Sequence, residues 1–137
     1  MGKTTTNKPL KVIIAGSRDI FDFQILEQAI QLSGFNIKEV VSGGARGVDK
    51  SGECWAKRKN IPIKQFIPDW GNIDKEDVVV RQNQYGSYNA KAGMERNEEM
   101  AKYADALILI WDGESSGSKN MLETAERYNL KIYVYEI

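Results

Sequence analysis

Three short glycine-rich stretches, each placed between an apolar run and a helical pattern, carry the residue types best suited to binding an anion. They are Gly16-Ser17-Arg18, Ser42–Gly47 and Gly113–Ser118. Glycine lets a ligand approach the backbone closely, and a helix N-terminus presents unpaired N–H groups to an anion. Arg18 and Arg46 lie within two of the stretches, and guanidinium groups suit phosphate or carboxylate. The expected chemistry is therefore recognition of a phosphorylated small molecule.

Each of these features, taken alone, also has a simpler explanation. A single glycine-rich stretch is typical of an ordinary turn. Arg18 or Arg46 could form a surface ion pair of little energetic value. Asp49 could simply favour the N-terminus of a helix, and Asp112 could either accept ribose hydroxyls or cap the loop that follows it. The binding interpretation depends on all three stretches lying at one edge of the fold.

The apolar run ALILIW, from Ala106 to Trp111, should form the central strand that positions these stretches. Its residues show no alternation of polar and apolar types, which is typical of a strand buried on both faces of a parallel sheet. A buried helix would read similarly, but the run is short and a Gly/Ser loop follows at once. Ligands of open parallel sheets bind beyond the carboxyl ends of the strands, so this loop lies where a site is expected.

Strands and helices alternate along the rest of the chain. The further expected strands are Lys11–Ala15, Lys38–Val41, Ile63–Ile67 and Lys131–Ile137. The expected helices run from about Asp22 to Ser33, from the end of SGGARGVD to about Lys59, from about Asn97 to Tyr103 and from about Ser118 to Tyr128, with Asp22 and Asn97 as N-caps and Gly34 as a stop. The alternation predicts an α/β, Rossmann-like three-layer fold with a mainly parallel five-stranded sheet and helices on both faces.

A long polar insertion at about 69–93 interrupts this alternation. A segment of this length is usually a functional lid, a local helix or a disordered loop, and a short helix over Lys75–Asn83 is one option. Its aromatic residues Trp70, Tyr85 and Tyr88 could stack on a base or pin the loop to the body of the domain. For Trp70, pinning is the preferred interpretation.

Length and charge limit the classes of protein to consider. The 137 residues suit a single domain, expected at 11–137 behind a flexible N-terminus at 1–10. The formal net charge is zero, which argues against a nucleic-acid partner because such proteins usually show a basic excess. No apolar run approaches the ~20 residues of a membrane span, and no signal peptide precedes the first strand. We therefore expect no membrane partner and a cytoplasmic location.

Cysteine and histidine usage narrows the chemistry further. Histidine is absent and Cys54 is the single cysteine, which excludes an intramolecular disulfide, a cysteine-based zinc cluster and His-containing triads. We expect neither a metal nor a cofactor, and acid–base chemistry would have to rest on Asp, Glu, Lys, Tyr or Cys. Cys54, within the second helix, is expected to be a small buried hydrophobic residue rather than a reactive thiol.

Four motifs taken together resemble the SLOG superfamily, and most closely its YspA, cpYpsA-related branch. They are GSR after the first strand, SGGARGVD after the second, AG-x-x-RNEEM before the central strand and DGESSGSKNML after it, so the resemblance covers about Lys11–Ile137. It implies a Rossmann-like fold that binds nucleotides or related ligands at the edge argued above. Some relatives are enzymes, some sense nucleotide-derived signals, and the DNA-processing protein A group binds single-stranded DNA. Pairing of relatives through helices beside the site implies a homodimer.

The Lonely Guy phosphoribohydrolases, which cleave the base–ribose bond of nucleoside monophosphates, offer a more detailed comparison. Arg96 matches their arginine, and Gly117 with Ser118 matches their glycine–threonine pair. The position of their catalytic glutamate is Met121 here, and Glu123 should point to the opposite side of its helix. Glu95 and Glu114 are possible substitutes. The resemblance therefore supports binding more strongly than hydrolysis.

We expect the chain to bind a nucleotide-derived small molecule, a nucleoside phosphate or an ADP-ribose-like ligand, as a sensor or sequestering protein. Backbone N–H groups would cradle phosphate or ribose, Arg18 and Arg96 would neutralise charge, and Asp112 would contact ribose. The residues assigned to the ligand are Gly16, Ser17, Arg18, Gly43, Gly44, Arg46, Gly47, Asp49, Arg96, Asn97, Asp112, Gly117 and Ser118. The alternative is an N-glycosidase acting on nucleoside monophosphates, with Arg96 and Glu95 as catalytic candidates, and the third option is binding of single-stranded nucleic acid.

Overall fold

The apolar run ALILIW forms strand β6 (Ala106–Trp111), whose first five residues are all buried. The computed structural model describes residues 8–17, 20, 22–45, 47–67, 80–83, 86–89 and 92–137. Over these residues, five parallel strands make one sheet in the order β3-β2-β1-β6-β7. The other four strands are β1 (Leu10–Gly16), β2 (Ile37–Ser42), β3 (Ile63–Gln65) and β7 (Lys131–Glu136). The predicted α/β fold class is confirmed.

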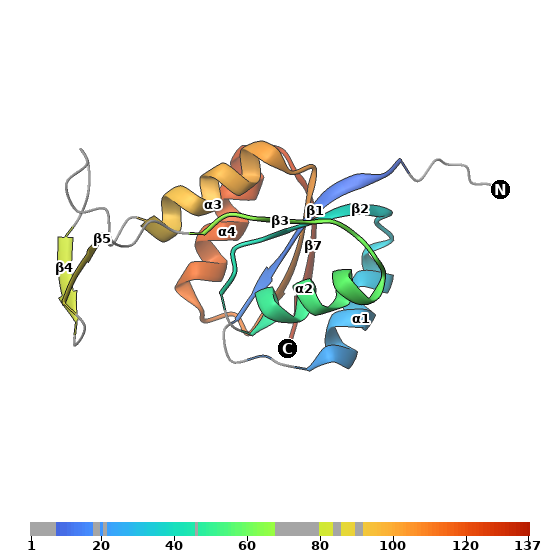
Figure 1. The fold of residues 1–137 in the computed structure, drawn as a ribbon, viewed down its shortest axis with the longest axis horizontal. Helices are drawn as coiled ribbons and strands as arrows, with labels where there is room; N and C mark the ends of the chain where they lie inside the picture. The colour runs from blue at the N-terminus through green and yellow to red at the C-terminus, as the bar shows by residue number, and fades with distance from the viewer. Residues whose placement is uncertain are drawn as a thin grey trace.

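Helices cover both faces of this sheet (Figure 1). The helices α1 (Phe23–Ser33) and α2 (Val48–Arg58) pack on one face, whereas α3 (Ala92–Tyr103) and α4 (Ser116–Arg127) pack on the other. The sheet has a hydrophobic core on each face. Successive residues of a strand point to opposite faces, so the apolar run of β1 and that of β6 each contribute side chains to both cores. The two cores make the three-layer arrangement that the sequence predicts.

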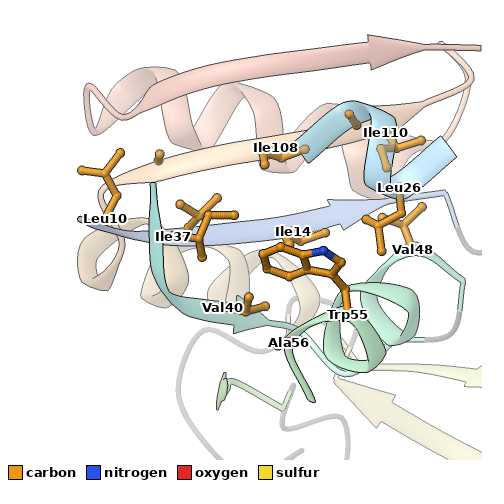
Figure 2. Packing of buried hydrophobic residues seen from close by; sticks show 13 residues of the cluster. Leu10, Ile14, Leu26, Ile37, Val40, Val48, Trp55, Ala56, Ile108 and Ile110 are labelled. Atoms are coloured by element: carbon orange, nitrogen blue, oxygen red, sulfur yellow. The ribbon is translucent and has the colours of Figure 1, made fainter. Parts of the chain in front are cut away.

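The core beneath α1 and α2 shows how the helices are held on the sheet (Figure 2). Trp55 of α2 and Leu26 of α1 belong to one buried cluster with Ile14 of β1 and Ile108 of β6. Ile14 and Ile108 have no exposed surface, and Trp55 is 8% exposed. A Cβ on Gly52 would lie 2.8 Å from the Ile14 Cγ2 atom, so α2 approaches β1 as closely as its backbone allows. This close approach fixes the start of α2 beside the carboxyl end of β1.

The chain reverses its direction of travel across the sheet between β1 and β6. It runs outward from β1 through β2 to β3, and then returns to add β6 and β7 on the other side of β1. At such a switch point the connections after the two strands leave in opposite directions and open a crevice beyond their carboxyl ends. The connections that follow β1 and β6 contain the first and third glycine-rich stretches.

Several predicted boundaries change in the structure. The capping of α1 is as predicted, because the Asp22 side chain accepts hydrogen bonds from two backbone N–H groups and Gly34 ends the helix at a φ of 72°. The prediction for Asn97 as an N-cap is wrong: α3 already begins at Ala92, since the preceding Ala-Gly-Met-Glu-Arg sequence is compatible with helix. β3 ends at Gln65 rather than Ile67, because its pairing partner β2 ends at Ser42.

The polar insertion contains a β-hairpin in its described part. β4 (Val80–Asn83) and β5 (Gly86–Asn89) pair antiparallel and form a separate two-stranded sheet. The suggested helix over Lys75–Asn83 is therefore wrong for its last four residues, and the rest of it lies outside the described residues. Trp70 and Tyr85 also lie outside the described residues, and the side chain of Tyr88 is not described.

Cys54 is exposed, in contrast to the prediction of a buried residue. At 100° per residue it lies on the same side of α2 as Lys50, Lys57 and Arg58, three or four positions away. All three of these charged residues are exposed. Among the residues that the structure describes, no helix is long and apolar enough to cross a membrane.

Candidate functional site

The three glycine-rich stretches meet at the switch point of the sheet. A hollow there is lined by Gly16 of the first stretch, Ala45 of the second and Gly117 of the third. Counting the part that opens to solvent, it spans about 450 Å³. The complete lining is Ala15, Gly16, Ala45, Asp49, Arg96, Asn97, Met100, Ser115, Gly117, Ser118 and Met121. We call this space the switch-point hollow.

The N-terminus of α4 supplies backbone donors to the switch-point hollow. Ser115 is the N-cap, and its side chain accepts a hydrogen bond from the Ser118 N–H at 3.4 Å. By helix geometry, the N–H groups of Ser116 and Gly117 have no partner within the helix. Nothing lies within 4 Å of a Cβ built on Gly117, so the backbone is open to a ligand there. This helix start has the features of an anion site.

Asp112 shapes the loop that leads into α4. Its Oδ1 atom accepts hydrogen bonds from the N–H groups of Glu114 at 2.9 Å and Ser115 at 3.1 Å. These two bonds are the main reason that the pKa of Asp112 is lowered, and the Ser17 hydroxyl adds a smaller contribution. The capping role that the sequence left open is therefore present. Asp112 is exposed, so its carboxylate also remains accessible from solvent.

The second glycine-rich stretch is organised differently, because the protein itself uses its backbone donors. The Gly44 N–H donates to the Ser42 hydroxyl at 3.1 Å, and the Ala45 N–H donates to Asp49 Oδ2 at 3.3 Å. The Gly43 N–H also lies near enough to the Asp49 carboxylate to act to lower its pKa. Gly44 and Gly47 have φ values of 72° and 80°, a conformation that favours glycine. This stretch therefore turns the chain sharply around Asp49. The backbone N–H groups that can donate hydrogen bonds to an anion are those at the start of α4.

Asp49 and Arg96 form the charged centre of the site. The Asp49 side chain is almost fully buried, and burial raises the pKa of Asp49 to about 6, against the lowering effect of the Arg96 charge and the hydrogen bond from Ala45. Arg96 Nη1 donates to the Gly43 carbonyl oxygen at 2.7 Å, and its Nε donates to Asn97 Oδ1 at 2.9 Å. Arg96 thus connects α3 to the second glycine-rich stretch and places a positive charge in the switch-point hollow.

A second polar network, which the sequence did not reveal, supports the same stretch from behind. Glu53 accepts hydrogen bonds from the Ser42 hydroxyl at 2.7 Å and from Gln65 Nε2 at 2.8 Å. Burial acts to raise the pKa of Glu53, but these hydrogen bonds and the nearby Lys50 charge outweigh it and lower the pKa. The signal in the sequence is the spacing of Asp49 and Glu53, four residues apart on the buried side of one helix.

The predicted ligand residues divide into three groups in the structure. Gly16, Asp49, Arg96, Asn97, Gly117 and Ser118 line the switch-point hollow, whereas Ser17, Gly43, Gly44, Gly47 and Asp112 lie in the connections that border it. Arg18 and Arg46 lie outside the described residues. The sequence missed Ala15, Ala45, Met100, Ser115 and Met121 as lining residues. Met100 and Met121 are apolar and nearly fully buried, and their positions follow from the helical periodicity of α3 and α4.

The distribution of carboxylates bears on catalysis. Met121 lines the hollow at the position where the Lonely Guy enzymes have their glutamate, and Glu123 is exposed, as its helical position predicts. Glu95 and Glu114 are not among the lining residues that the structure describes, so Asp49 is the one carboxylate of that lining. No group of three Asp, Glu, Cys or His side chains converges to hold a metal ion in the described part of the chain.

Comparisons with known proteins agree with this architecture. Residues 10–72 match the family described as YspA, cpYpsA-related SLOG family. The fold is similar to DNA processing protein A from Streptococcus pneumoniae, with a TM-score of 0.64 and 19% identity, covering 90% of this chain and 49% of that one. It is also similar to DNA processing protein A from Helicobacter pylori, a protein with a unique single-stranded DNA binding mode, with a TM-score of 0.62, 21% identity and coverage of 92% and 65%.

The sequence match concerns residues 10–72, whereas the structural matches concern the fold of nearly the whole chain. At such identities the two solved structures establish the fold alone, and this chain spans less than two thirds of either of them. No protein with a curated description is significantly similar in sequence.

Proposed function

We propose that this chain, whose residues 10–72 match the YspA, cpYpsA-related SLOG family, binds a nucleotide-derived small molecule in the switch-point hollow. The ligand is a nucleoside phosphate or an ADP-ribose-like molecule, and the protein acts as a cytoplasmic sensor or sequestering protein. The observation that carries the proposal is the meeting of three separate glycine-rich stretches around Arg96 at one switch point. Ligands of open α/β sheets bind at this place.

The phosphate belongs at the start of α4. The N–H groups of Ser116 and Gly117 are available there, and the helix dipole favours negative charge. Arg96 lines the same hollow, so its charge adds to the attraction. Met100 and Met121 give the hollow an apolar side against which a base or sugar can pack. The site thus combines a cationic and backbone-donor part with an apolar part, as a phosphorylated organic molecule requires.

Substitution of Gly117 by alanine tests the position of the phosphate. The added methyl group has space in the free protein, so stability should be unchanged or raised by up to about 1 kcal/mol, because alanine favours helix over glycine. The same methyl group occupies the path of the ligand to the backbone, so affinity for AMP and ADP-ribose should fall at least about tenfold, which corresponds to about 1.4 kcal/mol. Isothermal titration calorimetry measures the affinity, and urea denaturation measures the stability.

The matched control is Glu123→Ala, a change on an exposed residue of the same helix, which should leave the affinity unchanged. The proposal fails if the unmodified protein binds neither AMP, ADP nor ADP-ribose at millimolar concentrations. The position of the phosphate at α4 is wrong if Gly117→Ala and Glu123→Ala bind these ligands as tightly as the unmodified protein does.

Cleavage of the N-glycosidic bond is a second candidate function, and the observation in its favour is Asp49. This carboxyl lines the hollow, and burial, its largest influence, raises its pKa to about 6, which suits a group that donates a proton to a leaving base near neutral pH. The missing glutamate at Met121 argues in the other direction. Chromatography of the AMP samples used for calorimetry would detect free adenine if the protein is a hydrolase.

A further inference from the structure

The Ser17 hydroxyl is a buried polar group that makes no hydrogen bond to the described residues. Ser17 directly follows β1 and is 3% exposed, and its Oγ atom has no hydrogen-bond partner within the part of the chain that the structure describes. The Ser17 backbone is held firmly, because its N–H donates to the Ile110 carbonyl at 3.1 Å and its carbonyl accepts from Val48 at 3.4 Å. A buried hydroxyl in a native structure normally has a partner, so this one calls for an explanation.

Asp112 provides the second half of the arrangement. It follows β6, the strand that pairs with β1 up to Gly16 and Ile110, so Ser17 and Asp112 leave adjacent strands at the same edge. Its Oδ1 atom is used by two backbone N–H groups, while no hydrogen bond of the described residues uses Oδ2. The Ser17 hydroxyl lies close enough to contribute to the lowered pKa of Asp112, yet the two groups do not meet the geometry of a hydrogen bond.

The two groups therefore present one donor and one acceptor side by side in the crevice between β1 and β6. A ligand hydroxyl satisfies both, because it can accept a hydrogen bond from the Ser17 O–H and donate one to the Asp112 carboxylate. Gly16, which precedes Ser17, lines the switch-point hollow, and so do Ser115 and Gly117, which follow Asp112 by three and five residues. A hydroxyl-bearing group would thus sit next to the proposed phosphate position, which is the arrangement of a sugar phosphate.

We propose that Ser17 and Asp112 recognise a ribose hydroxyl of the ligand, so that the site selects ribonucleotides over their deoxyribose counterparts. This inference rests on the proposed function and narrows it, because it excludes DNA components as preferred ligands. A deoxyribose that lacks the contacted hydroxyl would leave the buried Ser17 hydroxyl without a partner. Sites built to hydrogen-bond a substrate hydroxyl discriminate strongly against analogues that lack it.

The test compares AMP with its 2′-deoxy and 3′-deoxy analogues by isothermal titration calorimetry. The unmodified protein should bind AMP at least about tenfold more tightly than one of the two analogues. The Ser17→Ala variant should bind AMP and that analogue with nearly equal affinity. Its thermal stability should be maintained, because the hydroxyl has no hydrogen-bond partner among the described residues of the free protein. The Asp112→Asn variant keeps an oxygen for the two N–H groups of the loop and should show the same loss of discrimination.

The matched control is Ser51→Ala, a serine-to-alanine change in α2 at a residue that does not line the hollow, which should retain the discrimination. Equal affinity of the unmodified protein for AMP and both analogues would overturn this inference and leave the proposed function intact. Discrimination that persists in Ser17→Ala would overturn the assignment to Ser17. Absence of binding to AMP and to both analogues would overturn the proposed function, and this inference with it.

Discussion

Replacement of Arg96 by methionine is expected to destabilise the protein by about 3 kcal/mol near pH 8 and to abolish binding of AMP. The Arg96 charge offsets the burial of the Asp49 carboxylate, and leaving a buried charge uncompensated typically costs about 3–5 kcal/mol. The lower end applies because Arg96 itself is only partly buried. The Gly43 carbonyl would also lose its hydrogen bond from Nη1. Urea denaturation measures the first effect and calorimetry measures the second.

The pH dependence of this loss identifies Asp49 as its cause. Burial raises the pKa of Asp49 to about 6 from its ordinary value of 3.8, so between these values the folded state holds the proton more tightly than the unfolded state. The cost of an ionised Asp49 is therefore complete above pH 6 and disappears as the pH falls towards 4. Without the Arg96 charge the pKa rises further, so the destabilisation should shrink by at least about half near pH 5.

Two further variants make this result specific. Asp49→Asn combined with Arg96→Met removes the buried charge and should recover much of the stability near pH 8. Arg127→Met removes an exposed arginine that pairs with Glu98 at 3.4 Å, and it should cost less than about 0.5 kcal/mol at either pH. A destabilisation by Arg96→Met that is equal near pH 8 and near pH 5 would contradict this account of the pair.

Replacement of Gly16 by alanine is the second change with a large expected effect. A Cβ at this position would lie 2.1 Å from the Ile110 carbonyl oxygen and 2.9 Å from Val48 Cγ2. The first of these is a backbone atom of the paired strand β6, which cannot move without separating β1 from β6. Overpacking of this kind typically costs about 1–3 kcal/mol, and we expect the upper end or more because the neighbour is backbone.

The Gly117→Ala variant is the control for this prediction, because it adds the same methyl group at a position with open space. Urea denaturation should show a loss of about 3 kcal/mol for Gly16→Ala and no loss for Gly117→Ala. A loss below about 1 kcal/mol for Gly16→Ala would mean that β1 and β6 can separate slightly without cost. The glycine would then serve ligand access alone rather than the packing of the switch point.

The sequence predicted the fold because its strongest signals are local and periodic. The apolar run of β6 can be buried on both faces only inside a parallel sheet, and Asp22 and Gly34 are effective at the ends of α1 whatever surrounds them. The predicted start of α3 was wrong because Asn97 has the side chain of a good N-cap, whereas in the fold its Nδ2 donates a hydrogen bond to Asn120 of α4. Tertiary contacts of this kind leave no periodic trace in the sequence.

The meeting of the glycine-rich stretches could also be predicted, since the carboxyl ends of parallel strands share one edge. Which of these stretches has backbone N–H groups open to a ligand could not be predicted. Whether the N–H groups of Gly44 and Ala45 are open to a ligand depends on Ser42 and Asp49 folding back to accept them, at distances of about 3 Å. That the Ser17 hydroxyl has no hydrogen-bond partner among the described residues likewise depends on how the side chains around it pack. Such details arise only from the packed structure.

The central claim is that a nucleotide places its phosphate at the first turn of α4 in the switch-point hollow. Two-dimensional NMR spectra of the ¹⁵N-labelled protein, recorded during titration with AMP, test it most directly because each backbone N–H reports separately. The account predicts saturable shifts of the Ser116, Gly117 and Ser118 amide signals, larger than those of Gly44 and Ala45, whose donors are already in use. Saturable shifts confined to residues outside the hollow, or no shifts at millimolar AMP, would contradict it.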